Sequence, residues 1–162
     1  MRRTRKPAPR RVYVDTNVLI NDCFYRNNVT NQAAKDGQFA NQAIAYLRTL
    51  RNTHLLIASF SVIQVVSTLS KTRKLGKQVV VDEVKHIMQQ YTVLDLTHQD
   101  LQAAIDAYTS GDLEDHIQYE VCRKLKCSHL LTDNIRDFKR FNVTVVKPKN
   151  VRRIALDFGV PK

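Results

Sequence analysis

The first acidic segment of the chain is Asp15-Thr16-Asn17, which directly follows an apolar run at positions 12–14. A carboxylate among apolar side chains is costly to bury unless it is paired, hydrogen-bonded or bound to a cation. At the carboxyl edge of a sheet, where α/β proteins build their sites, Asp15 could hold such a cation. The same three residues could instead form a turn that caps the next helix, because Asp, Thr and Asn favour such positions.

Two further acidic segments lie late in the chain, at positions 112–116 and 132–138. The earlier one stands at the start of an expected helix and contains Asp112 and Asp115. Acids in a first helical turn can simply stabilise the helix dipole. The later one follows an expected strand and contains Thr132, Asp133, Asn134 and Asp137. A polar loop with a capped short helix would explain this segment equally well.

Apolar residues change repeatedly between strand-like and helix-like spacing along the chain. This pattern predicts strands at 12–14, 54–60, 92–96, 129–132 and 143–146, with helices between them. Ser61 is expected to cap the helix after the second strand. Tyr91 and Tyr108 are expected in the core, and His116 at the surface or behind the site. The alternation predicts one α/β domain with a largely parallel, helix-flanked sheet.

In a parallel sheet, strand carboxyl ends and helix amino ends share one edge. Asp15, Asp115 and one of Asp133 and Asp137 are therefore expected to gather there and to need a cation against their mutual repulsion. Oxygen ligands without His or Cys select a hard ion, Mg²⁺ or Mn²⁺. Such an ion can orient a water and stabilise the charge that develops on a phosphodiester. The acids therefore indicate a metal-dependent nuclease.

The charge of the chain favours a polyanionic partner. Its 162 residues carry a formal net charge of +11, and the isoelectric point is near 9.8. Nucleic acid is the expected partner, and a basic surface that serves only solubility is the alternative. Three cysteines without metal-ligand spacing indicate a reducing cytoplasm. No apolar run is long enough to cross a bilayer, so no membrane partner is expected.

Three regions are expected along the chain. Residues 1–11 are predicted to form a disordered basic tail, which begins close enough to Asp15 to reach RNA bound there. Residues 12–150 are predicted to form the domain. Residues 151–162 are predicted to form an extension that packs on the domain or trails from it.

Taken in order, the acidic segments resemble the motifs of the PIN-domain ribonucleases, a family that includes toxins of the VapC type. The matching residues are 14–19, 112–119 and 132–138, so the resemblance covers nearly the whole chain apart from the tail and the last dozen or so residues. The later segments are similar to the PIN_3-like branch. The resemblance implies a three-layer α/β/α PIN-like domain whose central, mostly parallel sheet has about five strands.

The resemblance also assigns roles to individual residues. It implies three catalytic and metal-binding acids: Asp15, Asp115 and Asp137. Asp133 is a further candidate ligand, and which of Asp133 and Asp137 contacts the metal stays open. The expected polar supports are Thr16, Asn17 and Thr132.

The chain departs from the family pattern at two positions. Gln64 stands where the family usually has Glu, and Asn134 stands where it often has Asp. An amide offers oxygen to a metal but no negative charge, so weaker metal binding is expected. Asp112 and Asp133 could compensate for the missing charges.

The function implied by the resemblance is that of an endoribonuclease that uses Mg²⁺ or Mn²⁺. Such a protein could be the toxin of a toxin–antitoxin pair, with a cognate antitoxin as a partner, and a homodimer. The alternative is a catalytically weakened protein of the same fold that serves as an RNA-binding or scaffold module. Gln64 and Asn134 are the residues that favour this alternative.

Overall fold

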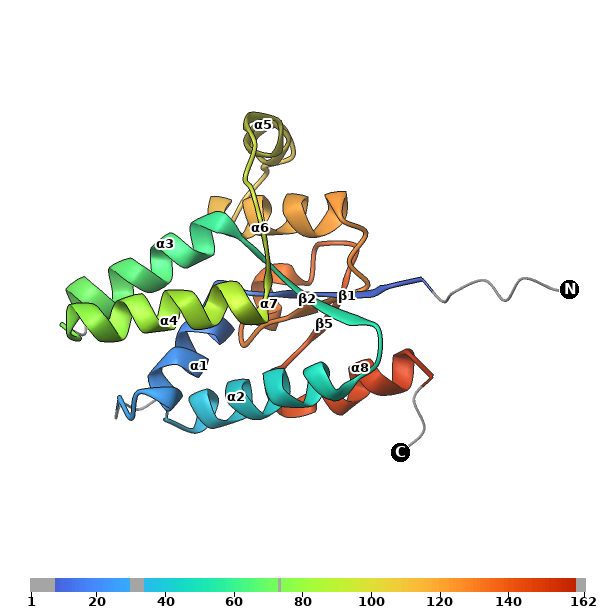
Figure 1. Cartoon of the computed structure of the whole chain (residues 1–162). Helices are drawn as coiled ribbons and strands as arrows, with labels where there is room; N and C mark the ends of the chain where they lie inside the picture. The colour runs from blue at the N-terminus through green and yellow to red at the C-terminus, as the bar shows by residue number, and fades with distance from the viewer. Residues whose placement is uncertain (1–7, 30–33, 73, 160–162) are drawn as a thin grey trace, which may run out of the picture.

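The computed structural model of the chain describes residues 8–29, 34–72 and 74–159. Residues 1–7, which make up most of the expected tail, lie outside the described residues. One sheet forms the centre of the molecule (Figure 1). Its strands are β1 (Arg10–Val14), β2 (Thr53–Ala58), β3 (Thr92–Leu94), β4 (His129–Leu131) and β5 (Thr144–Val146). They lie in the order β3-β2-β1-β4-β5 and all pair in parallel, which confirms the predicted fold class.

Strand β1 occupies the middle of the sheet, and its register is fixed on both sides. Tyr13 is aligned with Leu56 of β2 and with Leu130 of β4. The amide of Asp15 extends the pairing by donating to the carbonyl of Leu131 at 3.0 Å. Asp15 therefore leaves the sheet at its central point, on the edge where all five strands end.

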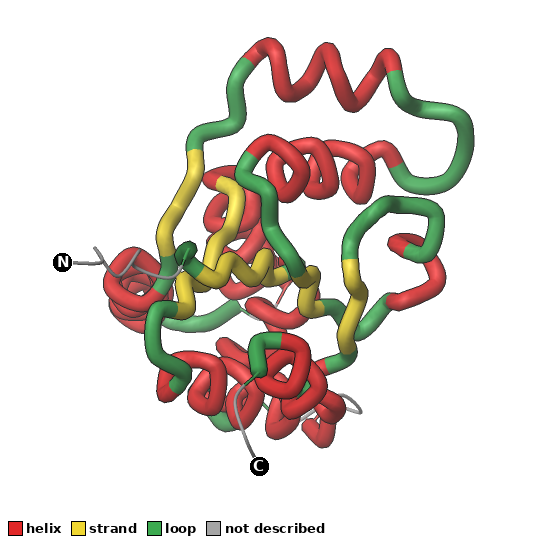
Figure 2. Tube along the Cα trace, turned by 90° about the vertical axis from the view of Figure 1, so that its right-hand side faces the viewer, coloured by secondary structure: helices red, strands yellow, loops and turns green. Residues whose placement is uncertain are grey.

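Helices cover both faces of the sheet and make the three layers that were predicted. The α-helices are α1 (Thr16–Arg26), α2 (Ala34–Thr49), α3 (Ser59–Ser67), α4 (Lys77–Gln90), α5 (His98–Asp106), α6 (Leu113–Lys124), α7 (Ile135–Phe138) and α8 (Arg152–Asp157). A π-helical turn (Thr68–Thr72) continues α3, and a 3-10 turn (Pro148–Asn150) precedes α8. Helices α1, α2 and α8 lie on one face and α6 on the other, while α5 lies outside α6 (Figures 1 and 2).

The central strands are buried on both faces, which explains their continuous apolar sequence. Val12 and Val14 face the larger core, which α1, α2, α3, α4 and α8 complete. Tyr13, between them in sequence, faces the smaller core formed with α6 and α7. This alternation follows from the two-residue period of a strand.

Several element boundaries differ from the sequence-based expectation. Strand β1 begins at Arg10, because Arg10 and Arg11 pair with β2 although they were expected in the tail. Helix α3 begins at Ser59, so Ser61 lies inside the helix and does not cap it. Tyr108 lies beyond the end of α5 and is 43% exposed, so its expected place in the core is wrong, whereas Tyr91 is buried.

The segment after residue 150 contributes to the larger core. Val151, Ile154 and Ala155 are buried there. Arg10 donates to the carbonyl of Phe158 at 2.9 Å, which joins this segment to the beginning of β1. None of the helices described in the structure is long and apolar enough to cross a membrane.

Candidate active site

Asp15 lies where β1 turns into α1, and only 3% of its surface is exposed. Its Oδ2 accepts hydrogen bonds from Asn17 Nδ2 at 2.5 Å and from Thr132 Oγ1 at 2.6 Å. Burial raises the pKa of Asp15, and the bond from Thr132 works in the opposite direction. The predicted supports Asn17 and Thr132 thus contact the carboxylate that they were expected to hold.

Thr16 and the neighbouring helices fix the start of α1. The hydroxyl of Thr16 shares a hydrogen bond of 2.8 Å with Ser61 of α3. The amide of Thr16 donates to Gln118 Oε1 of α6 at 3.4 Å. Gln118 is almost completely buried, and a hydrogen bond from it also lowers the pKa of Asp15. Gln118 was not predicted from the sequence, although it lies one helical turn after Asp115 and so shares its helix face.

Asp115 extends from the first turn of α6 toward the same place. Its Oδ2 atom is buried and has no hydrogen-bond partner among the described residues. Burial, together with the charges of Asp15 and Asp137, raises the pKa of Asp115 to about 7. Asp15 and Asp137 therefore both lie close enough to Asp115 to disfavour its charged form.

This donor set fits a hard divalent cation. A buried carboxylate oxygen without a partner is costly unless a proton or a cation satisfies it. Within the described part of the chain, no three His, Cys, Asp or Glu side chains lie close enough together to enclose an ion. Mg²⁺ does not require such a cage, because it commonly binds one or two protein carboxylates and keeps several waters. Asp15 and Asp115 provide such a pair.

Asn134 and Asp137 form a second polar pair beside the first. The amide of Asn134 donates to Thr132 Oγ1 at 2.9 Å, and its side-chain Nδ2 donates to Asp137. Thr132 therefore links this pair to Asp15. Asn134 acts here as a donor that orients a carboxylate.

The structure does not bring Asp133 and Asp112 to the same point. Asp133 Oδ2 accepts from Asn21 Nδ2 of α1 at 3.0 Å. Its pKa is raised by burial and by Asp36, and neither Asp15 nor Asp115 contributes. Asp112 caps α6, because its Oδ1 accepts from the amide of Glu114 at 2.9 Å. Of the two, only Asp112 acts on the pair, by raising the pKa of Asp115.

Gln64 contacts an acid that the sequence analysis did not select. Its Nε2 donates to Glu114 Oε2 at 2.8 Å, while its Oε1 is buried without a partner among the described residues. The charge of Glu114 raises the pKa of Asp15, so Glu114 lies near the site. Glu114 directly precedes Asp115 in the sequence, and this position could have indicated that it lies near the site. Glu114 of α6 thus supplies, next to Gln64 of α3, the negative charge that position 64 lacks.

His116 is buried, so of its two expected places the surface is wrong. Its ring lies edge-on to Tyr108 and to Phe141, with centroids 5.2 and 5.0 Å away. Its Nε2 lies 3.3 Å from the carbonyl oxygen of Ser110. His116 therefore lies on a buried side of α6 and supports the loop before this helix.

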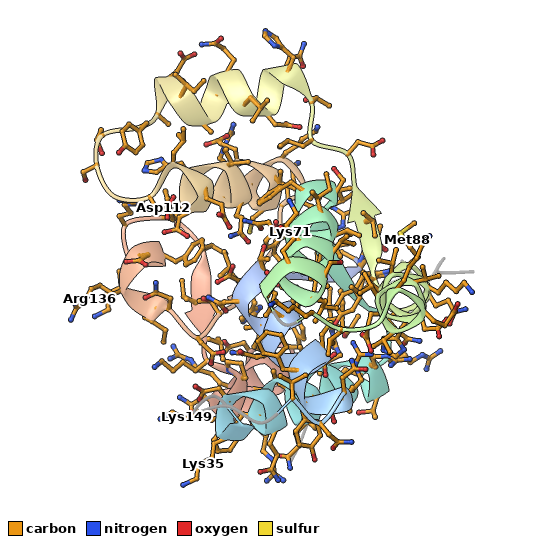
Figure 3. The ribbon with its side chains drawn as sticks, turned by 90° about the vertical axis from the view of Figure 1, so that its left-hand side faces the viewer. Lys35, Lys71, Met88, Asp112, Arg136 and Lys149 are labelled. Carbon is orange, nitrogen blue, oxygen red and sulfur yellow. The ribbon has the colours of Figure 1, made fainter. Side chains whose placement is uncertain are left out.

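The site lies on the edge of the sheet opposite the point where the chain enters β1. Figure 3 views the molecule from the side on which β1 ends, and Asp112 and Arg136 lie on the same flank there. Strand β1 spans Arg10–Val14, a length of about 16 Å at about 3.3 Å per residue. The tail was expected to begin close enough to Asp15 to reach RNA bound there; residues 1–7 lie outside the described residues, and the described chain enters β1 at the end of this strand away from Asp15.

Comparison with solved structures identifies the fold. One match is VapC20 of Mycobacterium tuberculosis, described as a toxin that cleaves the sarcin–ricin loop, with a TM-score of 0.54 and 14% identity over 74% of this chain and 86% of that chain. A toxin–antitoxin complex from Klebsiella pneumoniae matches with a TM-score of 0.58 and 18% identity, over 85% of this chain and 97% of that chain.

A third match is VapBC2 from Rickettsia felis bound to a DNA fragment of its promoter. It has a TM-score of 0.54 and 14% identity, over 85% of this chain and 98% of that chain. No protein-family model matches the sequence, and no curated protein is similar to it. The chain has the fold of the VapC-type PIN-domain toxins, as the sequence motifs predicted.

Proposed function

We propose that the protein is an endoribonuclease that depends on Mg²⁺ or Mn²⁺. The observation that carries this proposal is the pair of carboxylates at the end of β1. Asp15 is buried with its Oδ2 held by two donors, and Asp115 presents a buried oxygen that has no hydrogen-bond partner among the residues that the structure describes. A metal-free pair of this kind is under electrostatic strain that a cation would relieve.

In this proposal Asp15 and Asp115 hold the cation, and Asp137 lies close enough to add negative charge. The chemistry that such a cation supplies is the activation of a water and the neutralisation of charge on a phosphodiester. The remaining residues orient the acids. Thr132 and Asn17 fix one oxygen of Asp15, and Gln118 holds the start of α1.

RNA is the substrate that this proposal assigns. The net charge of +11 supports a polyanionic ligand, since each Lys or Arg that meets a phosphate adds affinity without reading sequence. One of the matched structures is a toxin–antitoxin complex. We therefore propose an antitoxin partner and a homodimer for this chain, and action in a reducing cytoplasm, which suits its three free cysteines.

The alternative, an RNA-binding module without catalysis, rests on Gln64 and Asn134. Both side chains serve as donors to neighbouring acids, Glu114 and Asp137. A protein with these amides could keep the fold and the basic surface while binding metal weakly.

The deciding experiment combines RNA cleavage with thermal unfolding. We expect Mn²⁺ to permit cleavage and to raise the melting temperature, because the ion binds only the folded acid pair. Asp15→Asn and Asp115→Asn should remove both effects. Asp106→Asn, on the outer helix α5, is the matched control and should keep both.

Two outcomes would contradict the proposal. RNA binding that is equal with Mn²⁺ and with EDTA, together with no cleavage, would favour the binding module. A melting temperature that rises with Mn²⁺ equally in all variants would place the metal elsewhere.

A further inference from the structure

Arg140 lies beside the acid pair and is held on three sides. Its guanidinium donates to the carbonyl of Ser110, in the loop before α6. The guanidinium carbon lies 4.9 Å from the centre of the Phe141 ring. Gly111 approaches so closely that a Cβ at this position would collide with the guanidinium. The side chain is therefore oriented although the residue is exposed.

The ring of Phe141, which lies under Arg140, packs against two residues of α6. Phe141 stacks on Tyr119 at a centroid distance of 4.2 Å and an interplanar angle of 12°. The buried ring of His116 meets Phe141 edge-on, and its Nε2 faces the same Ser110 carbonyl. Helix α6 thus positions both Asp115 and, through these aromatic rings, the guanidinium of Arg140.

Arg140 is a cation near Asp115 that forms no ion pair with any acid in the described part of the chain. It acts on Asp115, since its charge lowers the pKa of that carboxyl against the effects that raise it. Among the described residues, however, Arg140 forms no ion pair, whereas Arg26 and Arg123 both do. A guanidinium has five donors, and the Ser110 carbonyl occupies only part of this capacity.

We propose that Arg140 binds a phosphate of the RNA backbone next to the acid pair. This inference rests on the proposed function and names the residue that receives the anionic group. The planar fork of a guanidinium matches two phosphate oxygens, and its stacking on Phe141 orients the fork before RNA arrives. A bound phosphate would also neutralise the positive charge of Arg140, which forms no ion pair with a carboxylate of the described residues.

A purely structural role for Arg140 would be to fasten the loop at Ser110 and Gly111. The two roles differ in what they predict for folded protein. Loss of a loop contact lowers the melting temperature and leaves the ionic component of RNA binding intact. Loss of a phosphate contact lowers the salt dependence of RNA binding, because fewer counterions are released.

The test measures binding of a fluorescent single-stranded RNA in EDTA, where no metal-dependent cleavage occurs, at several salt concentrations. We expect Arg140→Gln to weaken binding roughly three- to tenfold and to reduce the log–log salt slope by about 0.7. Arg140→Lys keeps the charge and should retain most of the slope. Arg51→Gln is the matched control, since Arg51 is exposed just before β2, at the opposite edge of the sheet, and should leave the slope unchanged.

A second series uses RNA in which one linkage at a time is an uncharged methylphosphonate. The wild type should lose affinity at the linkage that Arg140 contacts, and Arg140→Gln should be insensitive there. Equal slopes for Arg140→Gln and Arg51→Gln would overturn the assignment, as would a wild type that binds no RNA. A wild type that shows the expected slopes but never cleaves RNA with Mn²⁺ would overturn the proposed function alone.

Discussion

Asp115 carries the clearest physical signature of the site, because its carboxyl is held in a place that disfavours charge. Burial and the neighbouring acids Asp15 and Asp137 raise its pKa to about 7, far above the usual value of 3.8. The folded protein therefore retains a proton that the unfolded chain releases at lower pH. Between these two pKa values, rising pH must favour unfolding, and above about pH 7 the loss is complete.

The prediction is that Asp115→Asn flattens this pH dependence. In EDTA, the melting temperature of the variant should exceed that of the wild type by a margin that grows from about pH 4 to about pH 7 and then stays constant, because Asn cannot ionise. Thermal unfolding at several pH values measures the margin, with Asp106→Asn as the control. A margin that is independent of pH would mean that Asp115 titrates normally.

Gln64 and Glu114 permit a second test of the local charges. Gln64→Glu should place two carboxylates at the 2.8 Å contact between these side chains, which lowers metal-free stability by about 1 kcal/mol or more and increases affinity for Mn²⁺. Unfolding with and without Mn²⁺ measures both effects. The double variant Gln64→Glu, Glu114→Gln exchanges the two groups and should recover the stability. If it does not, the two side chains are not paired.

The helices and strands were predictable where neighbouring residues determine them. Their boundaries were less predictable where contacts with residues distant in the sequence determine them. The capping box at Thr97 and Asp100 is visible in the sequence and is present in the structure. The cap of α3 was placed three residues too late, at Ser61 and not at Ala58, because the hydroxyl of Ser61 bonds to Thr16, which is 45 positions away, and does not cap the helix. Tyr108 lies beyond a helix end that its apolar spacing did not reveal.

The same distinction applies to the candidate site. Asp15, Asp115 and Asp137 were selected from short motifs, and in the structure the charges of Asp15 and Asp137 both act on Asp115. Gln118 and Glu114 were missed, since an interior glutamine and a first-turn glutamate have common structural explanations. Their contacts with Thr16 and Gln64 arise only when α6 packs across the ends of β1 and α3.

The packing of α1 against α2 depends on Gly37. A Cβ at this position would lie 2.8 Å from the carbonyl oxygen of Asn21 and 3.1 Å from the Cβ of Tyr25. Gly37→Ala should therefore destabilise the protein by about 1–3 kcal/mol, although Ala is the better helix former. Chemical denaturation measures the change. Gly76→Ala, which meets no atom within 4 Å, should stay within about 0.5 kcal/mol of the wild type.

The fold as a whole includes the C-terminal segment in its core. The boundary expected at residue 150 separates Val151, Ile154 and Ala155 from the apolar residues that they contact. A chain that ends at Asn150 should lose about 4 kcal/mol or more, which corresponds to a melting temperature lower by roughly 8–16 °C. Thermal unfolding of the truncated chain measures this loss. An unchanged melting temperature would show that residues 151–162 form a dispensable extension.

The central position of β1 also determines when the site can form during synthesis. Asp15 is made early, but the Thr132 hydroxyl that holds it lies 117 positions later. At about 5–20 residues per second, the ribosome needs roughly 6–23 s to add that stretch. Until then β1 lacks its β4 neighbour, and Asp15 lacks the hydrogen bond from Thr132. Under the proposed function, the nascent chain therefore stays inactive for most of the time that it is attached to its own messenger RNA.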